Sequence, residues 1–283
     1  MLISVTSLSG HLYCPRKLFL THVLGLVEVP KEVLVKGSIR HETYDSINKI
    51  EEELVKSITK KPTLKALTSK YETEYTKILK DAVNSYRDKL KELNLDQSET
   101  FNKILPYFIR ESQIRSLNLF SFIEKEGLLG EELWQSLIPK IRSEIKINSQ
   151  NLQLKGIIDQ IEVWKNRLVP VELKTGKMPF GGVWPGHRIQ LGCYALLLEE
   201  KYGSTINYGY VHYLDHEEKR LIKINHFLRS EINDLIKKVQ ALMVSQEIPG
   251  FCGNENKCNA CGLKETCSNN ELIQNKLTEI TTN

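Results

Sequence analysis

The clearest periodic pattern along the chain is a stripe of apolar side chains that recur every three or four residues between positions 63 and 93. A spacing of this kind places the side chains on one face of an α-helix. Pro62 precedes the stripe and Asn94 follows it, and both residue types are typical of helix boundaries. The pattern therefore predicts one long amphipathic helix over 63–93. Its buried face consists of Leu64, Leu67, Tyr71, Tyr75, Ile78, Ala82, Tyr86, Leu90 and Leu93.

Two further helical stretches surround this one. Residues 30–55 mix polar and apolar positions at helical spacing, and residues 101–140 do the same. Because proline lacks a backbone N–H and glycine weakens a helix, we expect helix breaks near Pro106 and Gly127. The sequence thus predicts a mainly helical segment over residues 50–140.

The periodicity changes from helical to alternating at residue 141. Apolar and β-branched residues then alternate with polar ones, which predicts strands over 143–147, 152–164 and 168–174, joined by short turns. A loop rich in glycine and proline follows. Beyond it the pattern predicts a helix, a strand hairpin and a last helix, over 187–201, 206–213 with 219–225, and 228–242. Strands flanked by helices in this order predict an α/β fold.

Composition limits the classes of protein to which the chain can belong. Its 283 residues suit one domain, and its 41% hydrophobic and 26% charged residues are ordinary for a globular protein. The sequence has no membrane-spanning run and no signal-peptide pattern, so we expect a cytoplasmic protein that does not bind membranes. The net charge of +4 permits nucleic-acid binding. Residues 51–140 carry acidic and basic side chains in balance, so we expect any DNA groove outside this segment.

A carboxylate motif lies within the most apolar of the predicted strands. Asp159 belongs to one strand, and Glu172 and Lys174 belong to the next one. Residues two apart on a strand point to the same face, so Glu172 and Lys174 lie side by side. Two carboxylates that hold Mg²⁺ or Mn²⁺ beside an ammonium group are the parts that phosphodiester hydrolysis needs. The alternative interpretation is a solvated strand face, where glutamate and lysine are common.

Other polar residues are weaker candidates when each is taken alone. His41 lies on the first predicted helix, where a single histidine is more often structural than a metal ligand. Gln190 and Tyr194 share one face of the helix after the glycine-rich loop, because they are four residues apart. Glu144, on the first predicted strand, is a further candidate for a metal site.

The six cysteines indicate metal or redox chemistry before disulfides, because we expect the chain to be cytoplasmic. Three of them follow a C-x2-C-x5-C pattern late in the sequence, and a fourth lies near its start. This spacing alone is compatible with zinc and with an iron–sulfur cluster. We expect Cys193 to be a buried apolar residue, and Cys252 to be a spare cysteine or a substitute for one of the ligands. The four cysteines of this arrangement are Cys14, Cys258, Cys261 and Cys267.

Six short motifs occur along the chain: CPRK near the start, GxxxHE around His41, GxxD, ExK, QxxxY and the CxxCx5C tail. Each motif is weak alone, but their order is specific. The chain resembles the CRISPR-associated RecB-like iron–sulfur nucleases of the PD-(D/E)xK superfamily (Cas4-type), which are related to the nuclease domains of AddB and of the Dna-two helicase-nuclease. A divergent archaeal, Csa1-like branch of this family is an alternative. The resemblance spans residues 1–50 and 141–270.

The resemblance implies a fold and a domain organisation. The fold is a mixed central sheet flanked by helices, in a single domain that spans residues 1–283. The segment between His41 and Asp159 is much longer than in typical members, so residues 50–140 are an insertion or an enlarged lid. Residues 249–270, together with Cys14, are the cluster region that joins the two ends of the chain.

The resemblance also implies roles for individual residues. The metal ligands are His41, Asp159, Glu172 and the backbone carbonyl of Leu173. Lys174 is the catalytic lysine, and Gln190 and Tyr194 orient that lysine or the DNA strand. A [4Fe–4S] cluster is held by Cys14, Cys258, Cys261 and Cys267.

The function implied by the resemblance is that of a Mg²⁺- or Mn²⁺-dependent DNA exonuclease. Such an enzyme acts on single-stranded DNA ends and trims spacer precursors together with CRISPR integrase proteins. The alternative is a module that binds DNA or the integrase and cleaves weakly or not at all. The sequence favours the nuclease because the carboxylates, the histidine and the lysine are all present.

Overall fold

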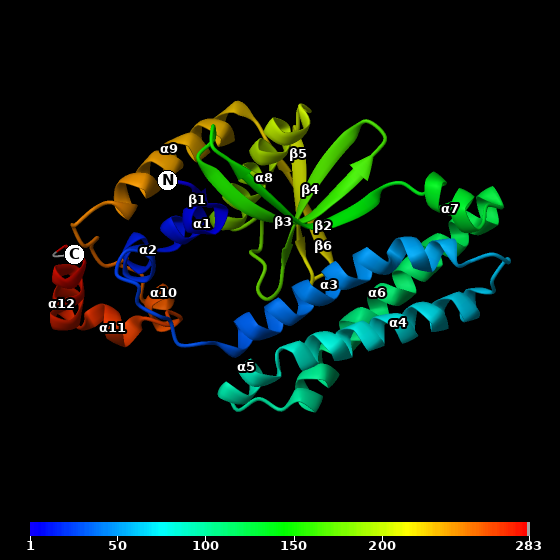
Figure 1. Cartoon of the computed structure of the whole chain (residues 1–283), viewed down its shortest axis with the longest axis horizontal. Helices are drawn as coiled ribbons and strands as arrows, with labels where there is room; N and C mark the ends of the chain where they lie inside the picture. Colours follow the sequence, from blue (N-terminus) through cyan, green and yellow to red (C-terminus); the bar gives the residue numbers. More distant parts are fainter. Residues whose placement is uncertain (282–283) are drawn as a thin grey trace.

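A mixed sheet forms the centre of the computed structural model, which describes residues 1–281 (Figure 1). The sheet order is β1–β3–β4–β5–β6, with β2 paired to β3. Strands β1 and β3 are parallel, as are β4 and β5, and the other pairs are antiparallel. The strands are β1 (Ile3–Ser4), β2 (Lys140–Ser149), β3 (Leu154–Trp164), β4 (Arg167–Lys174), β5 (Tyr208–Tyr213) and β6 (Glu218–Lys223).

Strand β3 has neighbours on both edges, but one edge is interrupted. Leu154 pairs with both Ile3 and Ser149, so β1 and β2 lie on opposite edges of β3. Further along, β4 takes over the edge that β1 occupied, and its pairing with β3 begins at Gln160. Residues 156–159 of β3 therefore have no strand partner on that edge. This interruption is where the candidate site lies.

Three helices pack on the sheet around this interruption: α1 (Val5–Tyr13), α8 (Pro185–Tyr202) and α9 (His226–Met243). Their shared core contains Ile161 of β3 together with Ile189 and Leu197 of α8. Gly156 allows α1 to approach β3 closely, since a Cβ atom there would lie 2.9 Å from the Cγ2 of Val5. The glycine of the GxxD motif therefore serves helix packing.

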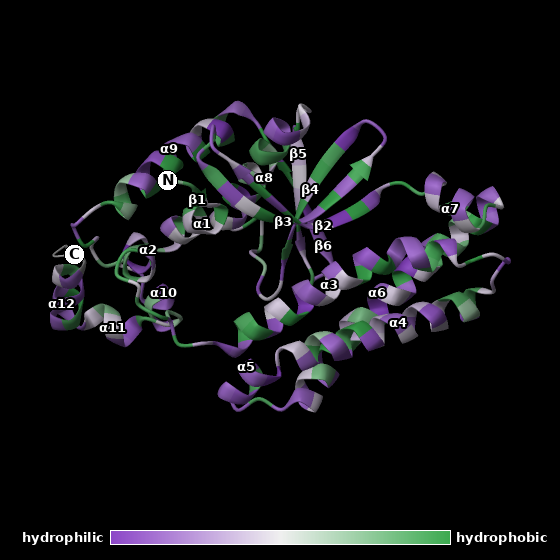
Figure 2. Cartoon of the chain, in the orientation of Figure 1, coloured by the Kyte–Doolittle hydropathy of each residue, from purple (hydrophilic) through white to green (hydrophobic). Residues whose placement is uncertain are grey.

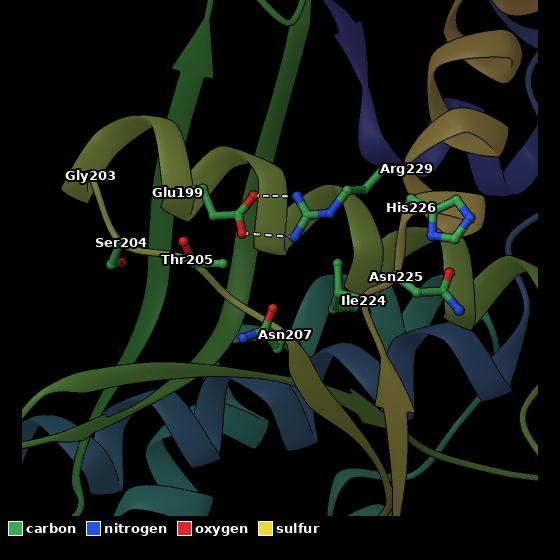
Figure 3. Close-up of a pocket in the computed structure, with 9 residues that line it drawn as sticks. All are labelled: Glu199, Gly203, Ser204, Thr205, Asn207, Ile224, Asn225, His226 and Arg229. Carbon is green, nitrogen blue, oxygen red and sulfur yellow. Dashed lines mark hydrogen bonds and ion pairs between the residues drawn. The ribbon is translucent and has the colours of Figure 1, made fainter.

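Figure 3 shows how the end of α8 is fixed to α9. Arg229 of α9 donates hydrogen bonds to both carboxylate oxygens of Glu199, at 2.5 and 2.9 Å. The backbone N–H of Ile206 donates to the same carboxylate, and Arg229 also donates to the Ile206 carbonyl. The charged groups of this surface hollow satisfy one another, so they hold the loop between α8 and β5.

A helical arm (residues 32–136) lies along the other side of the sheet (Figure 1). Its helices share a core with the β4 residues Val171 and Leu173, which ties the arm to the sheet. Apolar and polar positions alternate around α4 and α6, as expected of amphipathic helices (Figure 2). The helices of the arm are α3 (Glu32–Lys56), α4 (Leu64–Ser85), α5 (Arg87–Glu92), α6 (Gln97–Glu126) and α7 (Gly130–Ser136).

Two predictions about the arm are wrong. The long helix expected over 63–93 is divided at Tyr86, whose ψ of 9° ends α4 before α5 begins. Conversely, α6 continues through Pro106, where we expected a break. Pro106 and Asn102 are both exposed, so the Asn102 carbonyl that lacks a partner in the helix is open to water. The predicted break at Gly127 is confirmed, with a φ of 69°.

The two ends of the chain meet on one side of the molecule (Figure 1). The side chain of Tyr13 donates a hydrogen bond to the Lys257 carbonyl at 3.1 Å, and the Lys257 ammonium donates to the Tyr13 carbonyl at 2.8 Å. A small core joins Phe19 and Leu20 to Leu263 and Ile273. The sequence pattern predicted none of the helices at these ends beyond α9. They are α1, α2 (Pro15–His22), α10 (Glu255–Asn259), α11 (Lys264–Ser268) and α12 (Asn270–Thr281).

Across residues 1–281, the structure contains no helix that combines the length and the apolar character needed to span a bilayer. The most apolar helices instead pack into the cores described above.

A largely buried arginine side chain connects the helices of the arm. Arg115 of α6 donates hydrogen bonds to Glu51, Glu111 and Asn48 at 3.2, 2.7 and 2.9 Å. Its side chain is 18% exposed, and the two carboxylates are similarly shielded. Glu51 also accepts hydrogen bonds from the hydroxyl of Tyr71 at 2.9 Å. Arg115 thus balances two carboxylates that water reaches poorly.

We predict that Arg115→Leu destabilises the protein by roughly 3 kcal/mol, because it leaves two shielded carboxylates without their cation. Arg110→Leu is the matched control on the same helix. Arg110 pairs with Glu217, but its side chain is 64% exposed, so we expect a loss of about 0–1 kcal/mol. Urea denaturation measures both, and equal losses for the two variants would contradict the assignment.

Candidate nuclease site and cysteine centre

A cavity of about 1150 Å³ lies where the edge of β3 is interrupted. Residues from α3, α8 and strands β2, β3 and β4 line it. It brings together every residue that the sequence predicted for the metal and catalytic site. They are His41, Asp159, Glu172, Leu173, Lys174, Gln190 and Tyr194.

The two predicted carboxylate ligands lie opposite each other at the point where β3 and β4 separate. The last paired residues are Gln160 and Val171, so Asp159 and Glu172 are the next positions in the same register. The Asp159 Oδ2 atom accepts a hydrogen bond of 2.8 Å from the Leu173 N–H. In a continuous antiparallel ladder, a backbone carbonyl of β3 would accept this hydrogen bond from Leu173. Here the Asp159 side chain accepts it instead. At this point the two strands are joined through a side chain beside the cavity, and not backbone to backbone.

Glu172 is 1% exposed, yet only one of its oxygens has a partner. Its Oε1 atom lies 2.5 Å from the ammonium of Lys174, and its Oε2 atom has no hydrogen-bond partner. A buried carboxylate oxygen without a partner is unfavourable unless a ligand satisfies it. The Glu172 carboxylate is therefore suited to a cation in the cavity.

His41 and Glu144 complete the group of possible ligands. The Nδ1 atom of His41 lies 3.8 Å from Asp159 Oδ1. Ligand atoms of His41, Glu144 and Asp159 all lie within 4.8 Å of one another. Burial lowers the pKa of His41, which keeps the imidazole neutral and able to bind a metal. Glu144 was only a minor candidate in the sequence, because its cross-strand position depends on the pairing of β2 with β3.

The carboxylates in the cavity carry more negative charge than the neighbouring lysine balances. Burial, and then the neighbouring Glu172, raise the pKa of Asp159 well above its usual range. Burial opposes the charge on Lys174, but Glu172 and Asp159 outweigh it and raise the pKa of that ammonium. Lys174 is thus cationic but is already paired with Glu172. The remaining carboxylates fit a divalent cation, which takes oxygen and imidazole ligands.

The two α8 residues predicted to orient the lysine are buried against the carboxylates. Gln190 is 6% and Tyr194 is 3% exposed. Burial and then Glu172 raise the pKa of Tyr194 well above its usual range. Tyr194 lines the cavity together with Glu172 and Lys174.

Asp215 is a residue that the sequence analysis did not identify. It follows β5 and accepts hydrogen bonds from Arg40, next to His41, and from the backbone N–H of Gly176 at 2.6 Å. Its carboxylate thereby connects the helix that carries His41 to the loop after Lys174. No local motif marks this role, since the three segments are far apart in the sequence.

The predicted cysteine ligands gather in a second cavity of about 220 Å³, near the meeting point of the chain ends. All four line it, and Cys252 lines it as well. The Sγ atoms of Cys252 and Cys258 are 3.3 Å apart. Cys252 and Cys258 are therefore direct neighbours in this cavity, so Cys252 lies beside the predicted ligands.

Arg16 of the CPRK motif supports the cysteine cavity. It is 6% exposed and donates hydrogen bonds to the Sγ atom and the carbonyl of Cys267, at 3.2 and 3.0 Å. It also donates to the Pro249 carbonyl and stacks on Phe251. These contacts fix both sides of the loop that contains Cys252. The sixth cysteine, Cys193, is fully buried in the core, as predicted.

Comparison with known proteins gives relatives of similar sequence. The chain is 31% identical over 166 residues to a CRISPR-associated exonuclease Cas4/endonuclease Cas1 fusion from Leptospira interrogans, covering 53% of this chain and 31% of that protein. It is 26% identical over 159 residues to CRISPR-associated exonuclease Csa1 from Saccharolobus solfataricus, covering 45% of this chain and 53% of that protein. The chain thus spans about a third of the first relative and half of the second.

One solved structure, the crystal structure of SSO0001, is similar with a TM-score of 0.33 and 19% identity, over 66% of this chain and 80% of that one. The family comparison is more extensive. A model described as the PD-(D/E)XK nuclease superfamily matches residues 2–268. The match contains both cavities, and with the mixed sheet flanked by helices it confirms the predicted fold class. The chain therefore belongs to the PD-(D/E)XK nuclease superfamily.

Proposed function

We propose that this protein is a divalent-metal-dependent DNA exonuclease that acts on single-stranded ends. One observation carries the proposal: Glu172, which lines the cavity together with His41, Asp159 and Lys174, has a buried carboxylate oxygen without a protein partner. In a nuclease that uses a metal ion, carboxylate oxygens must be free of protein partners so that they can coordinate the metal. A module that only binds DNA has no use for this unfavourable burial.

Each residue has a distinct role in this proposal. His41, Asp159, Glu172 and the carbonyl of Leu173 hold the cation, Mg²⁺ or Mn²⁺. When bound, such a cation activates water and neutralises charge on the scissile phosphate. Lys174 supplies a positive charge beside the reacting phosphate, where negative charge increases in the transition state. Gln190 and Tyr194 form the α8 wall of the cavity and keep the carboxylates in place.

An exposed aromatic residue supports single-stranded DNA as the substrate. Phe180 lies in the loop after Lys174. Its side chain is fully exposed and does not pack into the core. Arg220 holds this loop through hydrogen bonds to the carbonyls of Pro179 and Gly182. A fixed aromatic ring in solvent is able to stack on an unpaired base. Double-stranded DNA offers no such unpaired base.

We further propose that the protein trims spacer precursors with a CRISPR integrase in the cytoplasm. Similarity to a Cas4/Cas1 fusion supports an integrase as the partner, because the fusion joins an exonuclease to an endonuclease in one chain. In this proposal residues 1–283 are a single domain, and the segment 50–140 is an insertion that packs on the sheet. The second candidate function, a binding module with weak cleavage, is tested by the same experiment.

We predict that the site variants separate into two classes in single-turnover cleavage of labelled single-stranded DNA with Mn²⁺. Asp159→Ala and Glu172→Ala lose metal binding and cleavage together, because each removes a ligand. Lys174→Ala keeps metal and DNA binding but cleaves about 10²–10³-fold more slowly, since its contribution belongs to the transition state. Lys174→Arg rescues little, because a planar guanidinium replaces a compact ammonium poorly.

The wild-type protein with EDTA is the control for metal dependence. Wild-type rates in all three alanine variants would contradict the site. Binding of single-stranded DNA without any Mn²⁺-dependent cleavage by the wild-type protein would support the binding module instead.

We also propose that Cys14, Cys258, Cys261 and Cys267 hold a [4Fe–4S] cluster that joins the chain ends. The cavity fits such a group, since four thiols converge there and Arg16 donates a hydrogen bond to one of them. Hydrogen bonds to cysteine sulfur atoms are typical of iron–sulfur sites, where they set the reduction potential.

For anaerobically purified protein we predict a brown colour and about four iron atoms per chain. Cys14→Ala and Cys261→Ala should lose most of this iron and lower the melting temperature by similar amounts, because one cluster needs both ends. Cys252→Ala is the matched control and should retain its iron. A colourless wild-type protein with one zinc ion per chain would contradict the cluster. Iron loss only in Cys252→Ala, and not in Cys14→Ala, would make Cys252 the fourth ligand.

A further inference from the structure

Glu144 occupies an unusual place in the sheet. In the antiparallel register of β2 with β3, Ser143 pairs with Gln160 and Ile145 pairs with Ile158. Glu144 is therefore opposite Asp159, but these two residues form the one position within the ladder that is not paired. The ladder of β2 and β3 is thus interrupted for one residue pair, at the same residue, Asp159, at which β3 also loses β4. The pairing is interrupted on both edges of β3 at the site.

The backbone of Glu144 is in a conformation that glutamate rarely adopts. Its φ angle is +51°, in the left-handed region that favours glycine. The neighbouring β2 residues continue the regular ladder, so the irregularity is confined to this residue. Strain of this kind is maintained when the surrounding structure demands it, often at functional sites. Here it accompanies a side chain that lines the cavity.

The Glu144 carboxylate has no ion pair or hydrogen bond of its own among residues 1–281. A ligand oxygen of Glu144 lies within 4.8 Å of ligand atoms of both His41 and Asp159. Glu172 gives independent evidence for a ligand, because it lines the same cavity and its buried Oε2 atom has no partner. Three possible ligand groups thus lie within 4.8 Å of one another, and Glu172 lines the same cavity as a third carboxylate.

We propose that Glu144 is a further ligand of the divalent cation, opposite the β4 side of the site, and that its strained backbone serves to place it there. This inference rests on the proposed function, because it concerns the same cation. With Glu144 included, the ligands come from β2, β3, β4 and α3. The bound cation would therefore link three strands of the sheet to the first helix of the arm. An imidazole among several carboxylates favours Mn²⁺ over Mg²⁺, since nitrogen ligands suit transition metals.

The test compares Mn²⁺ binding by calorimetry, without DNA, in Glu144→Gln and in Glu42→Gln. Glu42 is the matched control: it lines the same cavity and carries the same charge, but its carboxylate accepts a hydrogen bond from Ser85 at 2.9 Å. We expect Glu144→Gln to weaken Mn²⁺ binding by at least about tenfold, and Glu42→Gln to weaken it by less than about threefold, through charge alone. Equal losses in the two variants would overturn the proposal.

A second variant separates the ligand role from folding. Glu144→Gly relieves the positive φ, so the metal-free protein should melt at the same or a higher temperature than wild type. It should nevertheless bind Mn²⁺ as weakly as Glu144→Gln does, and Mn²⁺ should raise its melting temperature less than that of wild type. Wild-type Mn²⁺ affinity in Glu144→Gly would overturn the proposal whatever its stability.

The outcomes also distinguish this inference from the proposed function. If the wild-type protein binds Mn²⁺ and cleaves DNA while Glu144→Gln binds Mn²⁺ normally, only the role of Glu144 is wrong. If the wild-type protein shows neither Mn²⁺ binding nor cleavage, the proposed function itself fails, and the Glu144 proposal fails with it.

Discussion

The burial of unsatisfied carboxylates at a break in strand pairing is the constraint on which the rest of the structure depends. Asp159 uses one oxygen to replace a backbone partner of Leu173, and Glu172 keeps one oxygen without any partner. A protein interior does not maintain such groups unless something else compensates them. Lys174 compensates one oxygen of Glu172, and the remaining negative charge is left for a cation. The cavity is therefore a consequence of the way in which the strands separate.

The surrounding elements keep that break from closing. The helix α3 supplies His41, and it is held by the arm core on one side and by the link from Arg40 through Asp215 to Gly176 on the other. On the opposite side, α8 places Gln190 and Tyr194 against the carboxylates, and Arg229 fixes the end of that helix. The cysteine cavity lies outside this region and joins the two ends of the chain. Cys14 of this cavity lies between α1 and α2, and α1 packs beside Gly156 at the edge of the site.

Much of this arrangement could be predicted from local patterns. The alternating residues after 141 predicted the three strands that carry the site, because an apolar face must lie on one side of each strand. The spacing of Glu172 and Lys174 predicted that they are neighbours, which a strand imposes geometrically. Gln190 and Tyr194 share a helix face for the same kind of reason. The family resemblance then supplied His41 and the cysteines, which no local pattern connects.

What could not be predicted depends on contacts between distant segments. The position of Glu144 follows from the register of β2 against β3, and the role of Asp215 requires three separate loops to meet. The continuity of α6 through Pro106 depends on which face of the helix is solvated. The helices at the chain ends are short, and the residues of their common core do not recur at a regular spacing in the sequence. Cys252 illustrates the limit, since its spacing left open whether it is a spare cysteine or a substitute ligand, and only the fold shows that it lines the cysteine cavity.

The most direct test of the account is to locate the cation itself. Crystals grown with Mn²⁺ and measured at the manganese absorption edge would show its position by anomalous scattering. We expect an anomalous peak in the cavity, within coordinating distance of His41, Glu144, Asp159 and Glu172. A cavity without a peak at saturating Mn²⁺, with the Glu172 oxygen still unpartnered or bound by a protein group, would contradict it.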